Sequence, residues 1–172
     1  FAPGDDGRIP VVAVTGTNGK TTTARLINHL LASSGLRTGM TNTDGVYVDG
    51  RQTDSGDCSG PKSARNVLMH PDVDAAVFEV ARGGVLREGL GFDRCQVAVV
   101  TNIGSGDHLG LNYITTVEDL AVLKRVIVRN GKLTAKPGSG AFLPRSGGEA
   151  ARPRQHLAPD MDPARNFGAK LY

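Results

Sequence analysis

Tryptophan is absent from this chain of 172 residues, and its aromatic residues are limited to five phenylalanines and three tyrosines. Proteins that bind single-stranded nucleic acids stack bases on aromatic side chains beside a basic groove. The chain's formal charge of +3 does not indicate such a groove, because residues 1–128 sum to −2 and residues 129–172 to +5. We therefore expect no nucleic-acid partner.

Long apolar runs are also missing, and cysteine is scarce. No stretch reaches the length needed to cross a bilayer, so we expect no membrane partner. Cys58 and Cys95 are too few for a disulfide framework and lack the spacing of a metal site. Free thiols are typical of a reducing compartment, so we expect a cytoplasmic protein.

The chain has room for one domain with a substantial core. Residues 1–9 are polar and glycine-bearing, which is typical of a linker, and the periodic patterns occupy residues 10–128. Residues 129–172 contain five of the nine prolines and no valine or isoleucine. Such a stretch buries too little apolar area to offset its ordering entropy, so we expect a disordered or aberrant tail. The first residue is Phe1, which favours a piece of a longer protein.

A phosphate-binding loop is the strongest local signal. The β-branched run of residues 11–15 predicts a strand, and helical periodicity starts at Lys20. Backbone N–H groups in such a loop, with the following helix dipole, surround a phosphate. Val14 occupies a position where the usual phosphate loop has glycine, and a glycine-rich turn opening an ordinary helix is the alternative. The residues expected to bind nucleotide are Gly16, Thr17, Asn18, Gly19, Lys20, Thr21 and Thr22.

The remaining pattern predicts an α/β fold. Strands are expected at 37–41, 75–80 and 97–103, with a hairpin at Asp49-Gly50, and helices at 20–33, 61–69 and 116–128. Stretches 51–61 and 104–111 read as loops, and 81–92 is glycine-rich with no helix or strand predicted. The first helix is expected to bury Leu26, Ile27, Leu30 and Leu31. Alternating strands and helices indicate a mostly parallel sheet flanked by helices.

Polar residues follow three of these strands at the edge where ligands of parallel sheets bind. Glu79 ends one strand, which is where a phosphate-loop protein needs a magnesium ligand beside Thr21. Asn102 ends another strand and is expected to contact the nucleotide. His108, next to Asp107, is a candidate second metal ligand. The alternatives are an arginine salt bridge for Glu79 and a structural role for His108.

These motifs resemble the central domain of the Mur ligase superfamily, which is P-loop NTPase-like. The resemblance covers residues 1–128. It rests on residues 15–22, Glu79, residues 101–103 and residues 107–109. Within the superfamily the chain is similar to the cyanophycin synthetase family, at residues 43–45, 56–61, 81–87, 89–93 and 107–111.

The resemblance implies an ATP- and Mg²⁺-dependent amide ligase that activates a carboxylate as an acyl phosphate. It places Lys20, His108 and Lys124 in catalysis, because Lys124 matches a carbamylated lysine that helps to hold a second magnesium ion. Sequence position alone gives Lys124 no special role. The narrower resemblance implies addition of arginine to an aspartate-rich polymer. The implied substrate contacts are Thr43, Asp44, Arg82 and Arg87, although structural salt bridges explain the arginines equally well.

Two departures from the family limit these expectations. The upstream ATP-grasp domain and the C-terminal ligase domain of the family are not recognisable in the chain. We therefore expect little turnover from the chain alone, and a truncated, inactive nucleotide-binding module is the alternative. A stand-alone phosphate-loop NTPase is a further alternative. In the loop of residues 56–61, Cys58 and Ser59 stand where threonines are expected, so the identity of the added amino acid stays open.

Overall fold

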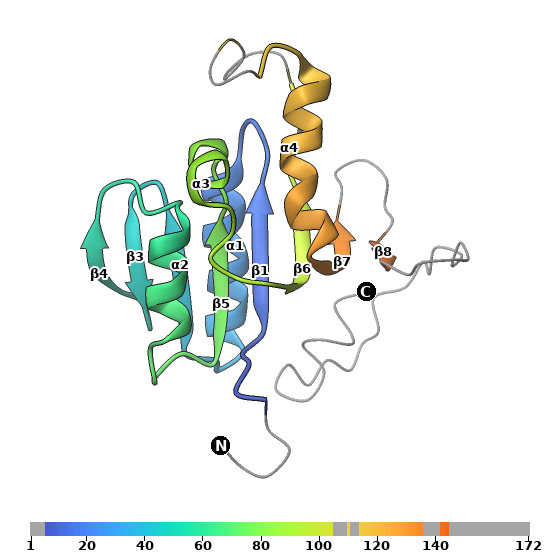
Figure 1. The fold of residues 1–172 in the computed structure, drawn as a ribbon. Coiled ribbons are helices and arrows are strands. Elements are labelled where there is room, and N and C mark those ends of the chain that lie inside the picture. The colour runs from blue at the N-terminus through green and yellow to red at the C-terminus, as the bar shows by residue number, and fades with distance from the viewer. Residues whose placement is uncertain (1–5, 105–109, 111–113, 136–141, 145–172) are drawn as a thin grey trace.

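The computed structural model describes residues 6–104, 110, 114–135 and 142–144, with the backbone alone for 133–135 and 142–144. Its strands form one eight-stranded sheet in the order β4-β3-β2-β5-β1-β6-β7-β8 (Figure 1). The strands are β1 (Val11–Thr15), β2 (Thr38–Asn42), β3 (Gly45–Val48), β4 (Arg51–Ser55), β5 (Ala75–Glu79), β6 (Cys95–Val100), β7 (Gly131–Ala135) and β8 (Phe142–Pro144). The helices are α1 (Lys20–Ser33), α2 (Pro61–Leu68), α3 (Arg82–Glu88) and α4 (Val117–Arg129).

The five central strands are parallel, which confirms the predicted α/β fold. β1 lies between β5 and β6, with Val12 aligned to Val77 on one side and Val97 on the other. β2 and β7 extend this parallel set, while β3, β4 and β8 are antiparallel additions at the two edges. Every residue of β1 and β5 is buried, as expected for strands covered on both faces.

The core has one layer on each face of the sheet. On one face, α1 covers Val12, Val14 and Val77. On the other face, Phe78 and Ala98 pack in a cluster with Val67 of α2 and Ile127 of α4. In Figure 1 the helices α2, α3 and α4 lie in front of the sheet and α1 lies behind it.

The predicted buried face of α1 is wrong in part. Leu31 is buried, but Leu26 and Leu30 are 57% and 59% exposed. The helix contacts the sheet through Ala24, Ile27 and Leu31, spaced three and four residues apart. Ala24 has the smallest side chain of the three and is fully buried, so it lies in the centre of the contact and turns Leu26 and Leu30 outward.

Two stretches for which no helix or strand was predicted contain regular elements. Residues 51–55 form β4, an exposed polar strand paired with β3 across the Asp49-Gly50 turn. Asp49 and Gly50 have φ of 49° and 75°, the left-handed values of a tight hairpin turn. Residues 82–88 form α3 although the helix contains two glycines. Gly84 packs against Gly60, where an added Cβ would lie 3.1 Å from the Gly60 Cα, so tertiary packing outweighs low helix propensity.

The prediction of a tail without regular structure is wrong at 131–135 and 142–144. Gly131 to Ala135 pair in parallel with β6, and β8 pairs with β7. Backbone pairing with an existing strand edge does not need an apolar pattern, which explains why composition gave no sign of β7. The rest of the stretch 129–172 beyond 135 lies outside the described residues, apart from β8.

None of the helices in the described ranges combines the length and the apolar character that crossing a membrane requires.

Candidate functional site

The phosphate loop connects the carboxyl end of β1 to the start of α1. Gly16 has φ of 151°, and a Cβ at this position would clash with the Thr101 hydroxyl. Gly19, the N-cap of α1, has φ of 80°. Both conformations suit glycine, so the two glycines that suggested the loop are required by its shape.

The end of β6 supports the loop through Asn102. The Asn102 carbonyl accepts from the Thr17 N–H at 2.9 Å, and its Oδ1 accepts from the Asn18 N–H at 3.0 Å. Asn102 Nδ2 donates to the Asn18 carbonyl at 2.9 Å, and the Thr101 hydroxyl donates to the same oxygen at 2.7 Å. The structure thus gives Asn102 a role in shaping the loop, and its predicted contact with nucleotide stays a prediction.

Glu79 lies directly beside the loop and is 1% exposed. Its Oε2 accepts a hydrogen bond of 2.8 Å from the Thr21 hydroxyl and one of 3.4 Å from the Thr43 N–H. The Thr21 and Thr43 hydroxyls are 3.2 Å apart. No ion pair of Glu79 occurs within the described residues, where the arginine salt bridge considered from the sequence is therefore absent.

The second oxygen of the Glu79 carboxylate, Oε1, makes the position beside Thr21 suitable for a cation. Glu79 Oε1 is buried and has no hydrogen-bond partner in the described part of the chain. Mg²⁺ prefers oxygen ligands and takes one or two carboxylates together with phosphate and water. Glu79 and the Thr21 hydroxyl meet this requirement. No three His, Cys, Asp or Glu side chains gather into a metal site among the described residues, and His108 lies outside them.

Lys124 reaches the phosphate loop from α4. Its Nζ donates to the Gly16 carbonyl at 2.6 Å, and the residue is 4% exposed. Burial, and to a smaller extent the positive charges of Lys20 and Arg82, lower the pKa of Lys124 to about 8. A capping box between Thr116 and Asp119 defines the start of α4.

Positive charge therefore converges on the loop. Lys20 is half-buried and donates from Nζ to the Thr17 carbonyl at 2.9 Å. Lys20 and Arg82 are close enough to Lys124 to disfavour its charged form. An anion placed among these three side chains would relieve their repulsion, which makes the loop suitable for a polyphosphate.

The predicted substrate residues are distributed unevenly around this site. Thr43 is next to Thr21 and Glu79, and Arg82 begins α3 near Lys124. Asp44 is paired with Arg25, whose Nη2 lies 2.7 Å from Asp44 Oδ2. Arg87 is exposed on the last turn of α3 and folds back over the backbone of that helix, so the structure does not bring it to Glu79.

Sequence reasoning missed Arg25 and Asn42 at this site. Arg25 follows Thr21 by one helical turn and would read as an exposed helix arginine. Asn42 ends β2 and is fully buried, and its Oδ1 accepts from the Asp44 and Gly45 N–H groups at 2.9 and 3.0 Å. An asparagine three residues before a glycine indicates such a turn, and it was the available signal.

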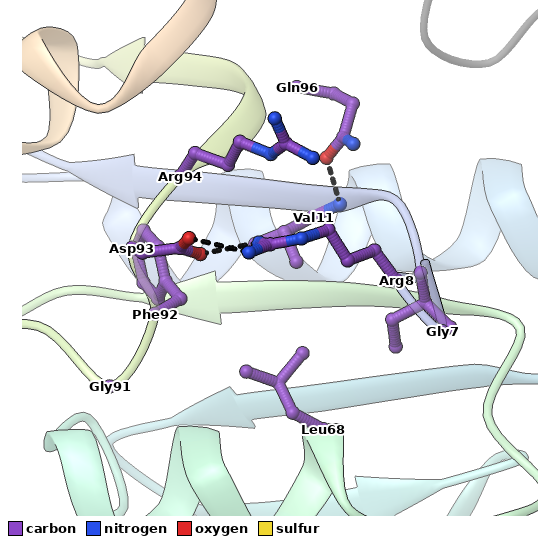
Figure 2. A pocket seen from close by; sticks show the side chains of 10 residues that line it. Gly7, Arg8, Val11, Leu68, Gly91, Phe92, Asp93, Arg94 and Gln96 are labelled. Carbon is purple, nitrogen blue, oxygen red and sulfur yellow. Dashed lines mark hydrogen bonds and ion pairs between the residues drawn. The ribbon is translucent and has the colours of Figure 1, made fainter. Parts of the chain in front are cut away.

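A separate hollow of about 270 Å³ lies at the opposite end of the sheet, by the amino end of β1 (Figure 2). Arg8 and Asp93 face each other across it in a two-armed pair of 2.7 and 2.8 Å. Gln96 Oε1 accepts from the Val11 N–H at 2.6 Å. None of the predicted site residues lines this hollow, and its polar groups bind one another.

Comparison with known proteins identifies the family of this domain. A model of the Mur ligase middle domain matches residues 14–136, past the predicted boundary at 128. The cyanophycin synthetase of Synechocystis sp. is 50% identical over 127 residues, which cover 74% of this chain and 14% of that protein. The chain thus spans 14% of the length of this relative.

Two solved structures share the fold. A UDP-N-acetylmuramoyl-L-alanyl-D-glutamate–2,6-diaminopimelate ligase aligns with a TM-score of 0.60 at 28% identity, covering 74% of this chain and 26% of that one. A bifunctional folylpolyglutamate synthase/dihydrofolate synthase, solved with Mn, AMPPNP and L-glutamate bound, aligns at 0.56 and 18% identity. It covers 84% of this chain and 48% of that one, and this likeness concerns the fold alone. The family match spans the loop, Glu79 and Lys124.

Proposed function

Because the chain belongs to the Mur ligase family, whose middle domain it matches, we propose that it is the ATP-binding domain of an ATP-dependent amide ligase. The observation that carries this proposal is the convergence on one loop of a buried carboxylate, a threonine hydroxyl and two lysines. Glu79 accepts a hydrogen bond from Thr21 at the start of α1, and Lys124 donates to the Gly16 carbonyl of the loop.

The loop would bind the phosphates of ATP. Backbone N–H groups at the start of α1, the helix dipole and the Lys20 ammonium group would all attract the β- and γ-phosphates. Gly16 and Thr22 belong to the same loop and helix start. Phosphoryl transfer depends mainly on positioning and charge neutralisation, which this arrangement supplies.

Thr21 and Glu79 would hold Mg²⁺ beside these phosphates, with His108 as a further ligand. Bound there, the ion would offset the repulsion between ATP and an anionic acceptor. The buried, unpaired Oε1 of Glu79 supports this role, since a buried carboxylate oxygen without a partner is costly.

We assign Lys124 to the catalytic group as a carbamylated lysine. A neutral lysine amine attacks carbon dioxide, forms an N–C bond and releases one proton, which leaves a carbamate anion. A pKa near 8 leaves roughly 10% of the amine neutral at pH 7. Lys20 and Arg82 would then attract the carbamate, whereas they repel the ammonium form.

The reaction would proceed in two steps. An acceptor carboxylate oxygen attacks the γ-phosphorus of ATP, and ADP leaves. An amine nitrogen then attacks the acyl carbon, phosphate leaves, and the amine loses a proton to give the amide. Following the cyanophycin synthetase relative, the acceptor would be a side-chain carboxylate of an aspartate-rich polymer, and the amine would come from arginine. The proposed substrate contacts remain Thr43, Asp44, Arg82 and Arg87. The reaction would take place in a reducing cytoplasm.

The test uses the chain with ATP, Mg²⁺, arginine and an aspartate-rich primer. Nucleotide binding by calorimetry, lost in Lys20→Ala and kept in Lys62→Ala, supports the ATP site. Lys62 is an exposed lysine of α2. Absence of nucleotide binding by the folded chain would overturn the proposal.

Product analysis separates the alternatives. ADP release that requires the primer supports a ligase, whereas release without the primer would indicate a stand-alone NTPase. A nucleotide-binding module would bind ATP without releasing ADP. It would also stay inactive when joined to the other domains of a cyanophycin synthetase.

A further inference from the structure

Asp44 combines a firmly held backbone with an exposed carboxylate. Its N–H donates to Asn42 Oδ1 at 2.9 Å, and its carbonyl accepts from the Gly56 N–H and from Gln52 Nε2, both at 3.1 Å. The Asp44 side chain is 51% exposed. Because its backbone is already fixed, a ligand that binds the carboxylate has less conformational entropy to remove.

The partner of this carboxylate in the described part of the chain is the guanidinium group of Arg25. Arg25 Nη2 donates to Asp44 Oδ2 at 2.7 Å, while Asp44 Oδ1 has no hydrogen bond to any described residue. The Arg8–Asp93 pair, in contrast, uses two nitrogens and both carboxylate oxygens. An exposed pair with a single hydrogen bond contributes little stability, so another guanidinium group can replace Arg25 at low cost.

The pair lies beside the proposed magnesium site. Asp44 directly follows Thr43, whose hydroxyl is 3.2 Å from that of Thr21 and whose N–H donates to Glu79 Oε2 at 3.4 Å. Arg25 comes one helical turn after Thr21, about 6 Å along α1. An extended arginine side chain can span such a distance, so an amine substrate held at Asp44 by its guanidinium group can reach the proposed acyl phosphate.

The charges around the site also favour a cationic ligand at Asp44. Lys20, Arg82 and Lys124 place positive charge at the phosphate loop, which suits a polyphosphate and repels a cation. Glu79 is buried, and the proposed function assigns it to magnesium. The exposed carboxylate of Asp44 is therefore the group that can attract a cationic amine.

We infer that Asp44 binds the guanidinium group of the amine substrate, and that Arg25 occupies this position while no amine is bound. The incoming guanidinium group binds Oδ1 and Oδ2 together, and so makes two hydrogen bonds where Arg25 makes one. Asp44 thereby selects amines that carry a guanidinium group over neutral amines of the same shape. This inference rests on the proposed function, because it requires an acyl phosphate to form beside Thr21 and Glu79.

The first test adds L-arginine to the folded chain with ADP and Mg²⁺, and follows the Asp44 backbone amide and the Arg25 Nε–H by ¹H–¹⁵N NMR. L-Citrulline is the control ligand, since it has the shape of arginine without the charge. Arginine is expected to shift both signals and to move the Arg25 signal toward its position in Asp44→Asn. Equal shifts with the two ligands, or no shift with arginine, overturn the inference.

The second test uses substitutions that should act in opposite directions. Asp44→Asn should bind arginine about tenfold more weakly, because it removes the charge and keeps the backbone contacts of the turn. Arg25→Ala should bind arginine about two- to fivefold more tightly, because the competing guanidinium group is gone. Asp54→Asn and Arg65→Ala make the same changes at exposed positions of β4 and α2 and are the matched controls. Wild-type affinity in Asp44→Asn, or an affinity of Arg25→Ala no higher than that of the wild type, overturns the inference.

The third test separates amine binding from metal binding. Mn²⁺ binding in the presence of ADP, followed by electron paramagnetic resonance, is expected to be equal in Asp44→Asn and the wild type. Mn²⁺ binding that is tenfold weaker in Asp44→Asn would make Asp44 a metal ligand and overturn the inference. Failure of the wild type to bind nucleotide would instead contradict the proposed function, whereas nucleotide binding without arginine binding contradicts this inference alone.

Discussion

Lys124 Nζ lies 2.6 Å from the Gly16 carbonyl oxygen, across 108 positions of the sequence. This contact joins α4 to the first residue of the phosphate loop. It buries an amine beside two further cations, so the protein carries unfavourable charge at this point when no anion is bound. Energy stored there is available to favour the binding of an anion.

Replacing Lys124 by methionine should change how stability depends on pH. The pKa of about 8 in the folded chain lies below the usual lysine value of about 10.4, so the unfolded chain binds more protons between these values. The free energy of unfolding of the wild type should therefore rise by up to about 3 kcal/mol, owing to Lys124, as pH rises from 8 to about 10.5. Lys124→Met should lack this gain in urea unfolding without carbon dioxide. A gain of equal size in Lys124→Met would contradict the prediction, and exposed Lys62→Met is the control.

Gly16→Ala should abolish nucleotide binding and destabilise the domain by about 1–3 kcal/mol. The added methyl group would clash with the Thr101 hydroxyl, which supports the loop. Gly35→Ala is the matched control. Gly35 also has positive φ, at 91°, but has open space around it and lies at the other end of α1. Calorimetry with ATP and thermal unfolding measure the two effects; a Gly16→Ala chain that binds ATP normally would refute the assignment of the loop.

Glu79→Gln should weaken Mg²⁺-dependent nucleotide binding about tenfold while the domain remains folded. The amide keeps the size of the side chain but removes the charge that attracts the ion. Because the substitution also removes a buried charge, the melting temperature should stay equal or rise. Binding measured with Mg²⁺ and with EDTA separates the two effects, and Glu88→Gln on the exposed end of α3 serves as the control. Equal Mg²⁺ dependence in Glu79→Gln and wild type would count against a metal site here.

Arg8→Ala should raise the pKa of Asp93, which the Arg8 hydrogen bonds hold at about 2. A carboxylate with a lowered pKa in the folded state contributes stability above its unfolded pKa of about 3.9, and this contribution is lost as pH falls through 2. Carbon-detected NMR titration of Asp93 measures the shift directly. Both side chains are largely exposed, so the change in overall stability should be small. A pKa that stays near 2 in Arg8→Ala would show that Arg8 is not the cause.

Local patterns in the sequence were enough to predict β1, the loop and α1, because glycines, a β-branched run and helix periodicity all act over a few neighbouring residues. The pairing of Glu79 with Thr21 also followed, since both belong to the carboxyl edge of a parallel sheet. Lys124 could be assigned only by resemblance, because its contact with Gly16 depends on the packing of α4.

Other features depended on tertiary contacts that no local pattern reports. α3 forms despite Gly83 and Gly84 because it packs closely on the loop before α2. Leu26 and Leu30 are exposed because Ala24 determines which stripe of α1 meets the sheet. β7 is held by pairing with β6 rather than by its own composition.

Three consecutive carbonyl groups of the phosphate loop each accept a hydrogen bond from a side chain. Gly16 accepts from Lys124, Thr17 from Lys20, and Asn18 from Thr101 and Asn102. With these carbonyls engaged, the peptide planes of residues 16–18 are held before any ligand binds. A preorganised loop loses little conformational entropy on binding, so more of its interaction energy is available for affinity. The backbone of the loop should accordingly keep one conformation with and without nucleotide.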